Sequence, residues 1–395
     1  MKIIGIEIIP ITVSFQRTTQ TSVTIIGGGL GGAGLDKEII KIFTDEGILG
    51  LGEITAGDPI FSGETQDTVV SIMRDVIGPN ILINEDPFNV DKIVDRMDSM
   101  VCGHNLTKSA IDCALFDIMG KSLKIPIYKL LGGLYHDKIP LRYCIGINPP
   151  DKMAEEAGLA MQAGFKGIKF KGGLDPQQDV EAFAKIRKTI GPGPKICIDV
   201  NAAYTIKTAL RVIKLVEEYG PIEMEQPLRL FDFAGTALLR KAASVPIGAC
   251  ENAVTIYEMM NVIRMEAADF FNFMMCRSGG FYRGKQIISM IDAAGLKCVG
   301  VDPMGLGIQL AANAHLGAST DKLEPPSGYG MGLFGLTGQF DTKNMDGQDI
   351  VLKTPKIENG FLEVPKGPGL GVELNEETMK RYLSAGKSPV LIGSK

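Results

Sequence analysis

From Ile139 to about residue 320, short β-rich runs alternate with helical runs at a nearly constant period. Seven such βα units follow one another. The residues that end the second to seventh β-rich runs are Lys171, Asp199, Glu225, Glu251, Met274 and Asp302, at intervals of 28, 26, 26, 23 and 28 residues. A constant period with polar residues at strand ends is typical of a closed parallel barrel that carries its active site at that face. We therefore predict an α/β fold with a TIM-like (β/α)7β barrel over residues 136–325, an eighth strand still to be placed, and an open doubly wound sheet as the alternative.

The segments that flank the barrel predict a capping domain. Residues 1–135 combine strand-like runs with three stretches of helical periodicity, and two of the runs form a hairpin-like pair around the turn at 44–47. Residues 326–395 lose the βα period and end in short strands and a short helix. We predict that 1–135 form an α+β capping domain and that the C-terminal segment leaves the barrel and packs on it.

The stretch IIGGGLGGAG at 25–34 fits a dinucleotide-binding fingerprint when it is read alone. Gly29, Gly31 and Gly34 have G-x-G-x-x-G spacing, and the acid Glu53 follows Gly34 by 19 residues. That fingerprint requires a helix directly after the glycine turn, but the next residues read as two strands joined by a turn. We interpret the glycines as a flexible lid loop, with a flavin or nicotinamide oxidoreductase as the alternative.

Composition argues against several classes of function. The formal net charge of −5 does not favour a nucleic-acid partner, which selects for a basic face. No apolar run approaches the about 18 residues of a membrane helix, so we expect no membrane partner. The N-terminus lacks the pattern of a signal peptide, and the seven cysteines form no C-x-x-C pair. We expect a cytoplasmic protein without a zinc cluster.

Asp199, Glu225 and Glu251 end three consecutive β-rich runs. Neighbouring barrel strands lie about 4.8 Å apart, so three carboxylates at matching heights would surround one point. Crowded carboxylates raise one another's pKa, and a hard divalent cation relieves the repulsion. All-oxygen ligation that leaves positions for water and substrate favours Mg²⁺. The alternative is that each acid is an ordinary strand-end residue paired with a local base.

Lys169 and Lys171 are two residues apart on a strand, so their side chains share one face. If that face is the barrel interior, mutual repulsion and a nearby cation would lower the pKa of Lys171 and leave it neutral near pH 7, able to act as a base. A solvent-exposed Lys-x-Lys edge is the alternative. Cation and amine together predict removal of the α-proton of a small carboxylate, with the cation stabilising the enediolate. Asn201, on the face of Asp199, either orients a lysine or a metal ligand or is a turn residue.

These motifs together resemble the enolase superfamily, and more narrowly the lysine branch of the mandelate racemase/muconate lactonizing enzyme group. The matching residues are K-x-K at Lys169 and Lys171, D-x-N at Asp199 and Asn201, E-x-P at Glu225 and Pro227, and the acid Glu251. The resemblance spans nearly the whole chain, including a capping-domain hairpin and a closing segment. It implies a Mg²⁺ site at the three acids, Lys171 as the base, assistance from Lys169, and a substrate-covering role for the glycine loop.

Residues 97–121 of the cap are locally similar to group members that act on hydroxyproline or its betaine, both epimerases and dehydratases. The chain contains no tryptophan, so an aromatic cage for a quaternary ammonium would need Tyr or Phe. We interpret His104 and Asn105 in this stretch as helix-entry or core residues rather than as substrate contacts.

Met274 occupies the place where two-base racemases of the branch carry a second lysine. Strand parity places Arg277 on the opposite face, so a single base remains. We therefore predict one-base β-elimination, as in a dehydratase, or cycloisomerisation, with Asp302 assisting the leaving group or binding a substrate amine. The alternatives are a racemase or epimerase of an amino-acid or proline-betaine derivative and a catalytically impaired carboxylate-binding homologue. We also expect a homo-oligomer.

Overall fold

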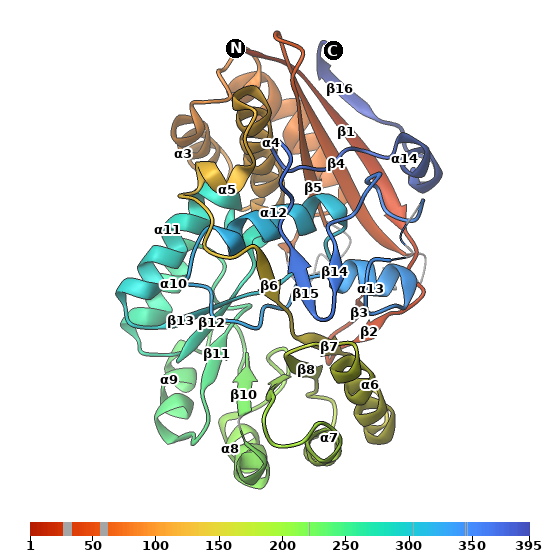
Figure 1. Ribbon diagram of the computed structural model, residues 1–395. Coiled ribbons are helices and arrows are strands. Elements are labelled where there is room, and N and C mark those ends of the chain that lie inside the picture. Colours follow the sequence, from red (N-terminus) through yellow and green to blue (C-terminus); the bar gives the residue numbers. More distant parts are fainter. Residues whose placement is uncertain (27–33, 56–61, 221, 303, 344, 346) are drawn as a thin grey trace.

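The structure is a computed structural model that describes residues 1–395 apart from 27–33, 56–61, 221, 303, 344 and 346. Figure 1 shows a barrel with its helices at one end of the molecule and an antiparallel sheet with its own helices at the other. Both termini lie at the outer end of that antiparallel sheet. Within the described part of the chain, no helix combines the length and apolar character that crossing a membrane requires.

Seven parallel strands form the curled sheet of the barrel, in the order β13-β12-β11-β10-β9-β8-β7. They are β7 (Tyr143–Ile145), β8 (Gly167–Lys171), β9 (Lys195–Asp199), β10 (Ile222–Glu225), β11 (Ile247–Ala249), β12 (Phe270–Phe273) and β13 (Lys297–Gly300). The segment 323–328 bridges in parallel to Cys298 and Val301 at one edge and to Leu141 at the other. It therefore closes the sheet as the eighth strand, and the predicted barrel is confirmed.

Helices between these strands cover the outside of the barrel (Figure 1). They are α6 (Pro150–Gln162), α7 (Pro176–Ile190), α8 (Ile206–Val216), α9 (Phe233–Ala242), α10 (Ile256–Arg264), α11 (Gly280–Ala293) and α12 (Gly307–Ala318). The N-cap residues Asp175, Thr205 and Thr255 each accept a bond from the first turn of their helix. Helical spacing then buries one apolar stripe on the strands, as with Ala209, Val212 and Val216 of α8.

The capping domain is built on a four-stranded antiparallel sheet in the order β16-β1-β4-β5. Its strands are β1 (Ile3–Val13), β4 (Leu35–Thr44), β5 (Leu49–Ile54) and the C-terminal β16 (Val390–Gly393). The helices that follow are α2 (Gln66–Ile72), the π-helix η1 (Met73–Leu82), α3 (Val90–Met100), α4 (Asn105–Leu123) and α5 (Ile127–Leu130). Strand β16 pairs antiparallel with β1, so the end of the C-terminal segment lies on the sheet of the cap.

The remaining elements are short. They are β2 (Thr19–Gln20), β3 (Ile25–Ile26), β6 (Lys138–Pro140), the 3-10 turns η2 (Glu217–Tyr219) and η3 (Met275–Ser278), α13 (Met331–Thr337), β14 (Ile357–Glu358), β15 (Phe361–Glu363) and α14 (Glu376–Tyr382). Strands β14, β15 and β6 form a small sheet that joins the C-terminal segment to the entrance of the barrel.

The glycine run is followed by a strand, because β4 begins at Leu35, directly after Gly34. Gly29 and Gly31, and the lid proposed for them, lie outside the described residues. The helix that a dinucleotide fingerprint needs is thus replaced by β4, which pairs with β5 across the predicted hairpin.

Helix α4 fixes the cap to both its own sheet and the barrel. A Cβ at Gly52 of β5 would lie 2.1 Å from the Ala110 carbonyl oxygen of α4, so only glycine permits this close approach. On the barrel side, Ser109 donates to the Met275 carbonyl, and the Asp112 carboxylate accepts the backbone N–H of Phe281. The cap therefore holds the turn that follows β12.

Candidate active site

The strand register brings the predicted acids and lysines to matching heights. Lys171 at the end of β8 pairs with Asp199 at the end of β9, and Asp199 pairs with Glu225 at the end of β10. Glu251 follows β11 by two residues. Exposed fractions of these four side chains lie between 0 and 8%, so all are buried at the mouth of the barrel. The alternative of a solvent-exposed Lys-x-Lys edge does not describe this geometry.

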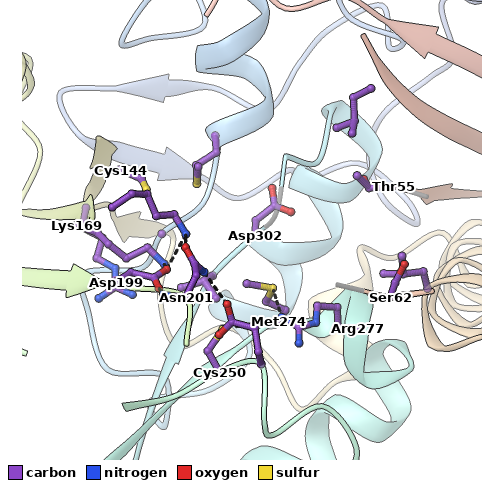
Figure 2. Close-up of a pocket in the computed structure, with 18 residues that line it drawn as sticks. Thr55, Ser62, Cys144, Lys169, Asp199, Asn201, Cys250, Met274, Arg277 and Asp302 are labelled. Carbon is purple, nitrogen blue, oxygen red and sulfur yellow. Dashed lines mark hydrogen bonds and ion pairs between the residues drawn. The ribbon is translucent and has the colours of Figure 1, made fainter. Parts of the chain in front are cut away.

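The two lysines lie among the carboxylates. Figure 2 shows Lys169 beside Asp199. Lys169 Nζ is 3.0 Å from Glu225 Oε2 and 3.4 Å from Asp199 Oδ2. Lys171 Nζ is 2.6 Å from the same Asp199 oxygen. Asp199 thus bridges the two ammonium groups, and every charge in this part of the site has a partner of opposite sign.

Asn201 links Lys171 to the third acid. Its Oδ1 lies 3.3 Å from Lys171 Nζ, and its Nδ2 donates to Glu251 Oε1 at 2.6 Å. The residue has φ 44°, in the left-handed region that asparagine tolerates better than most side chains. The other oxygen of Glu251, Oε2, is buried and has no hydrogen-bond partner among the described residues. Such an orphaned carboxylate oxygen is a ready ligand for a cation.

Opposing effects set the charges of these groups. Burial raises the pKa of Asp199, but the charges of Lys171 and Lys169 outweigh it and hold the pKa at about 2. Burial lowers the pKa of Lys171, but Asp199 outweighs it and raises the pKa above the ordinary lysine value. The pKa of Glu251 is raised by burial and by Asp199. The Asp199 carboxylate therefore favours the ammonium form of Lys171, whereas the predicted neutral amine depends on a bound cation beside it.

The donor set fits Mg²⁺ by its chemistry. Three carboxylates, one of them with the unpaired Glu251 oxygen, provide hard oxygen ligands. Within the described residues, no three His, Cys, Asp or Glu side chains form a preassembled metal cluster. The Lys169 ammonium group instead pairs with both Asp199 and Glu225.

The same cavity is lined on its other side by Met274, Arg277 and Asp302. Figure 2 shows Lys169 and Asp199 on one side, and Met274, Asp302 and Arg277 facing them. Burial, reinforced by the charge of Glu53, raises the pKa of Asp302 to about 7. Asp302 therefore exchanges a proton near neutral pH, whereas Met274 offers no titratable group.

Arg277 was misplaced by the parity argument. Strand β12 ends at Phe273 and the 3-10 turn η3 follows, so the period of two stops before Arg277 is reached. The turn brings its side chain to the wall that Met274 also lines. Arg277 is thus a site residue that the sequence interpretation excluded.

The cap contributes the remaining wall. The cavity is lined from the cap by Leu35 of β4 and Leu106 of α4. Thr55 and Ser62, the residues on either side of 56–61, also line it. His104 lies outside this lining and serves as the N-cap residue of α4, with φ 52°. Its interpretation as a helix-entry residue is confirmed. Met331 of α13 completes the wall from the C-terminal segment.

Sequence comparison finds relatives for both parts of the chain. Residues 36–132 match the family described as mandelate racemase/muconate lactonizing enzyme, N-terminal domain, and residues 152–378 match the family described as enolase C-terminal domain-like. The N-succinyl-L-Arg/Lys racemase of Bacillus cereus is 31% identical over 87% of this chain and 89% of its own. Its crystal structure superposes with a TM-score of 0.89, 28% identity, and 99% and 100% of the two chains covered.

Two further relatives differ in the activity that their names state. Muconate cycloisomerase 1 of Rhodococcus opacus is 28% identical over 87% of this chain and 90% of its own. A dipeptide epimerase from Enterococcus faecalis V583, solved in complex with Mg and the dipeptide L-Leu-L-Tyr, has a TM-score of 0.85 and 26% identity and covers 94% of this chain and 100% of its own. The likeness therefore spans cap and barrel together.

Proposed function

The chain belongs to the mandelate racemase/muconate lactonizing enzyme group of the enolase superfamily, and on that premise we propose that it removes the α-proton of a small carboxylate substrate in a Mg²⁺-dependent reaction. The observation that carries the proposal is the bridge from Lys171 through Asn201 to Glu251, whose second oxygen is buried and unpaired. It places a lysine and a free carboxylate oxygen in one cavity.

In this proposal Asp199, Glu225 and Glu251 hold the metal. Support comes from their shared height at the strand ends and from the Mg complex of the Enterococcus faecalis dipeptide epimerase. A Mg²⁺ ion bound there supplies positive charge to the substrate carboxylate and to the enediolate. Lys169 and Lys171 form ion pairs with two of these carboxylates, Glu225 and Asp199.

Lys171 is proposed as the base and Lys169 as its assistant. Loss of the Asp199 contact removes the charge that raises the pKa of Lys171, and burial then favours the neutral amine that accepts a proton. Lys169 lies deeper in the barrel, where it bonds to Glu225, and its charge contributes to the electrostatic field at Lys171. Asn201 orients the Lys171 amine through its side-chain oxygen.

Asp302 is proposed as the acid that assists a leaving group. It lines the same cavity, and its pKa of about 7, raised first by burial and then by Glu53, leaves a substantial protonated fraction at neutral pH. With Met274 on the wall that faces Lys169, the described lining of that wall offers no second lysine. We therefore propose a one-base outcome, either β-elimination or the cycloisomerisation that the name of the Rhodococcus opacus relative states.

A racemase or epimerase acting on an amino-acid derivative is the second candidate. The names of the Bacillus cereus and Enterococcus faecalis relatives favour it. The lining of this cavity favours the one-base reaction, because no lysine accompanies Met274.

Proton exchange in D₂O separates the candidates. We expect wild-type protein with Mg²⁺ to exchange the α-proton of one enantiomer only in a panel of acid sugars, hydroxyprolines, their betaines and N-acyl amino acids, followed by ¹H NMR. Exchange of both enantiomers would support the epimerase. If no compound in the panel shows an α-proton exchange that requires both Mg²⁺ and Lys171, the proposed reaction is contradicted.

A further inference from the structure

Arg277 is a buried cation that has no oxygen partner in the part of the chain that the structure describes. Its side chain is 6% exposed. Among the described residues, its Nη1 bonds to two sulfur atoms, Met274 Sδ at 3.4 Å and Cys250 Sγ at 3.9 Å, and its buried Nε has no acceptor. Thioether and thiol sulfur are weak acceptors, so most of the five donors of this guanidinium are unused within the described part of the chain.

The other buried cations of the described residues all bond to oxygen. Each buried lysine has a carboxylate within 4.0 Å, in the pairs Lys37–Glu53, Lys41–Glu376, Lys108–Asp98, Lys169–Glu225 and Lys171–Asp199. Arg142 donates to Asn272 Oδ1 at 2.6 Å and lies 3.7 Å from Glu223. Arg187 donates to backbone carbonyls. A buried guanidinium left without such partners is destabilising, which points to a role in binding.

Hydrogen bonds within the barrel and from the cap fix the position of the turn that carries Arg277. Its backbone N–H donates to the Met274 carbonyl in η3, and the neighbouring Met275 carbonyl accepts from Ser109 of α4. Asp112 of the same cap helix accepts the backbone N–H of Phe281 after the turn. Cap and barrel thus jointly hold the guanidinium at the cavity wall.

We propose that Arg277 binds a second carboxylate of the substrate, so that the enzyme acts on a dicarboxylate. This inference rests on the proposed function, in which the first carboxylate lies at the Asp199, Glu225 and Glu251 side. The guanidinium lies on the facing wall (Figure 2). Its planar fork matches a carboxylate in a bidentate pair, and burial strengthens that pair.

The apolar part of the cavity lining matches the carbon chain that would join the two carboxylates of such a substrate. Leu35, Leu106, Val301 and Met331 are apolar, and Met274 lies beside Arg277. A short carbon chain that links two carboxylates satisfies this lining, with one anionic end at each wall. A monocarboxylate would leave the guanidinium unpaired in the closed site.

Binding of matched acids tests the inference. Isothermal titration of Mg²⁺-loaded protein compares glutarate with pentanoate and adipate with hexanoate. We expect each dicarboxylate to bind wild type about 30-fold or more tightly than its monocarboxylate, as for truncation of a buried charge pair. Arg277→Met is expected to abolish the preference, and Arg277→Lys to retain part of it. Equal binding of both acids by wild type would overturn the inference.

Melting temperature without added metal or acid supplies a second readout. Arg277→Met removes an unpaired cation, so we expect the melting temperature to stay level or rise. The matched variant Arg142→Met, on the same cavity, unpairs Asn272 and Glu223 and is expected to lower it. A comparable fall for both variants would assign Arg277 a structural role and overturn the inference.

A Mg²⁺ titration separates the inference from the function on which it rests. Arg277 also lowers the pKa of Glu251 through its charge, so a shared effect on metal is the competing explanation. If Arg277→Met weakens Mg²⁺ binding by as large a factor as it weakens dicarboxylate binding, the second-carboxylate role fails. If monocarboxylates bind with Mg²⁺ and without a dicarboxylate preference, only this inference fails. If no carboxylate binds in a Mg²⁺-dependent way, the proposed function fails with it.

Discussion

Lys171 Nζ lies 2.6 Å from Asp199 Oδ2, and both side chains are almost fully buried at the ends of adjacent strands. The pair does two things at once. It compensates two charges that burial alone would suppress, and it joins the proposed base to a proposed metal ligand. A change in the charge of one partner therefore changes the pKa of the other.

Replacement of Lys171 by methionine tests the base. Met keeps the apolar stem and removes the amine, so we expect α-proton exchange to fall by about 10³-fold, within the usual range for loss of an acid–base group. The measurement is ¹H NMR of substrate in D₂O. Lys188→Met, at an exposed lysine, is the control and is expected to exchange like wild type. Equal rates in the Lys171 variant would rule this residue out as the base.

Asp199→Asn tests the metal site. The substitution removes a carboxylate and leaves the Lys169 and Lys171 ammonium groups without the acid that they share. We expect Mg²⁺ at a hundredfold excess over Kd to stabilise wild type by about 2.7 kcal/mol and so to raise its melting temperature. The melting temperature of the variant should not change. EDTA should reverse the wild-type shift. A variant that responds to Mg²⁺ like wild type would argue against ligation by Asp199.

The barrel was predictable because its strand ends repeat, but the position of its eighth strand was not. Residues 323–328 contain two prolines and make only isolated bridges to Leu141, Cys298 and Val301, so no β-rich run marks them. Likewise, parity worked at Lys169 and Lys171 because β8 is regular through Lys171. It failed at Arg277, where a 3-10 turn had replaced the strand.

Glu53 shows a different limit of the sequence. Its spacing from Gly34 imitates the acid of a dinucleotide site, yet its carboxylate accepts the N–H groups of Leu306 and Gln309 at the start of α12 and pairs with Lys37. The contacts reach across about 250 positions of the chain. No local pattern records a bond between cap and barrel of that kind.

Glu53→Gln is therefore expected to weaken the joint between the two domains. It leaves the Lys37 ammonium buried without its carboxylate, and we expect the free energy of unfolding to fall by about 3–5 kcal/mol. Urea denaturation followed by circular dichroism measures it. Glu363→Gln removes a more exposed pair with Lys138 and should change stability by about 1 kcal/mol or less. Similar effects for the two variants would contradict a joint at Glu53.

His315 predicts an acid limit to stability. Burial lowers its pKa from 6.5 to about 4, and among the described residues only its Nε2 has a partner, the Leu370 carbonyl. Between these values the unfolded chain binds a proton that the folded chain does not, so stability rises with pH. We expect wild type to lose about 3 kcal/mol more than His315→Gln as the pH falls from 6.5 to 4. The exposed His136→Gln variant should behave like wild type, and parallel curves for all three proteins would refute the assignment.

Met274→Lys tests why this chain uses one base. The new amine would lie beside the Arg277 guanidinium, which is 3.4 Å from Met274 Sδ, and both that charge and burial lower the pKa of an amine. A neutral lysine on the wall that faces Lys171 supplies a second base. We therefore expect the variant to exchange the α-protons of both enantiomers in D₂O, whereas Met274→Leu keeps the one-sided exchange of wild type. If a folded Met274→Lys protein exchanges one enantiomer only, the wall at Met274 does not face the substrate α-carbon, and the one-base argument loses its structural support.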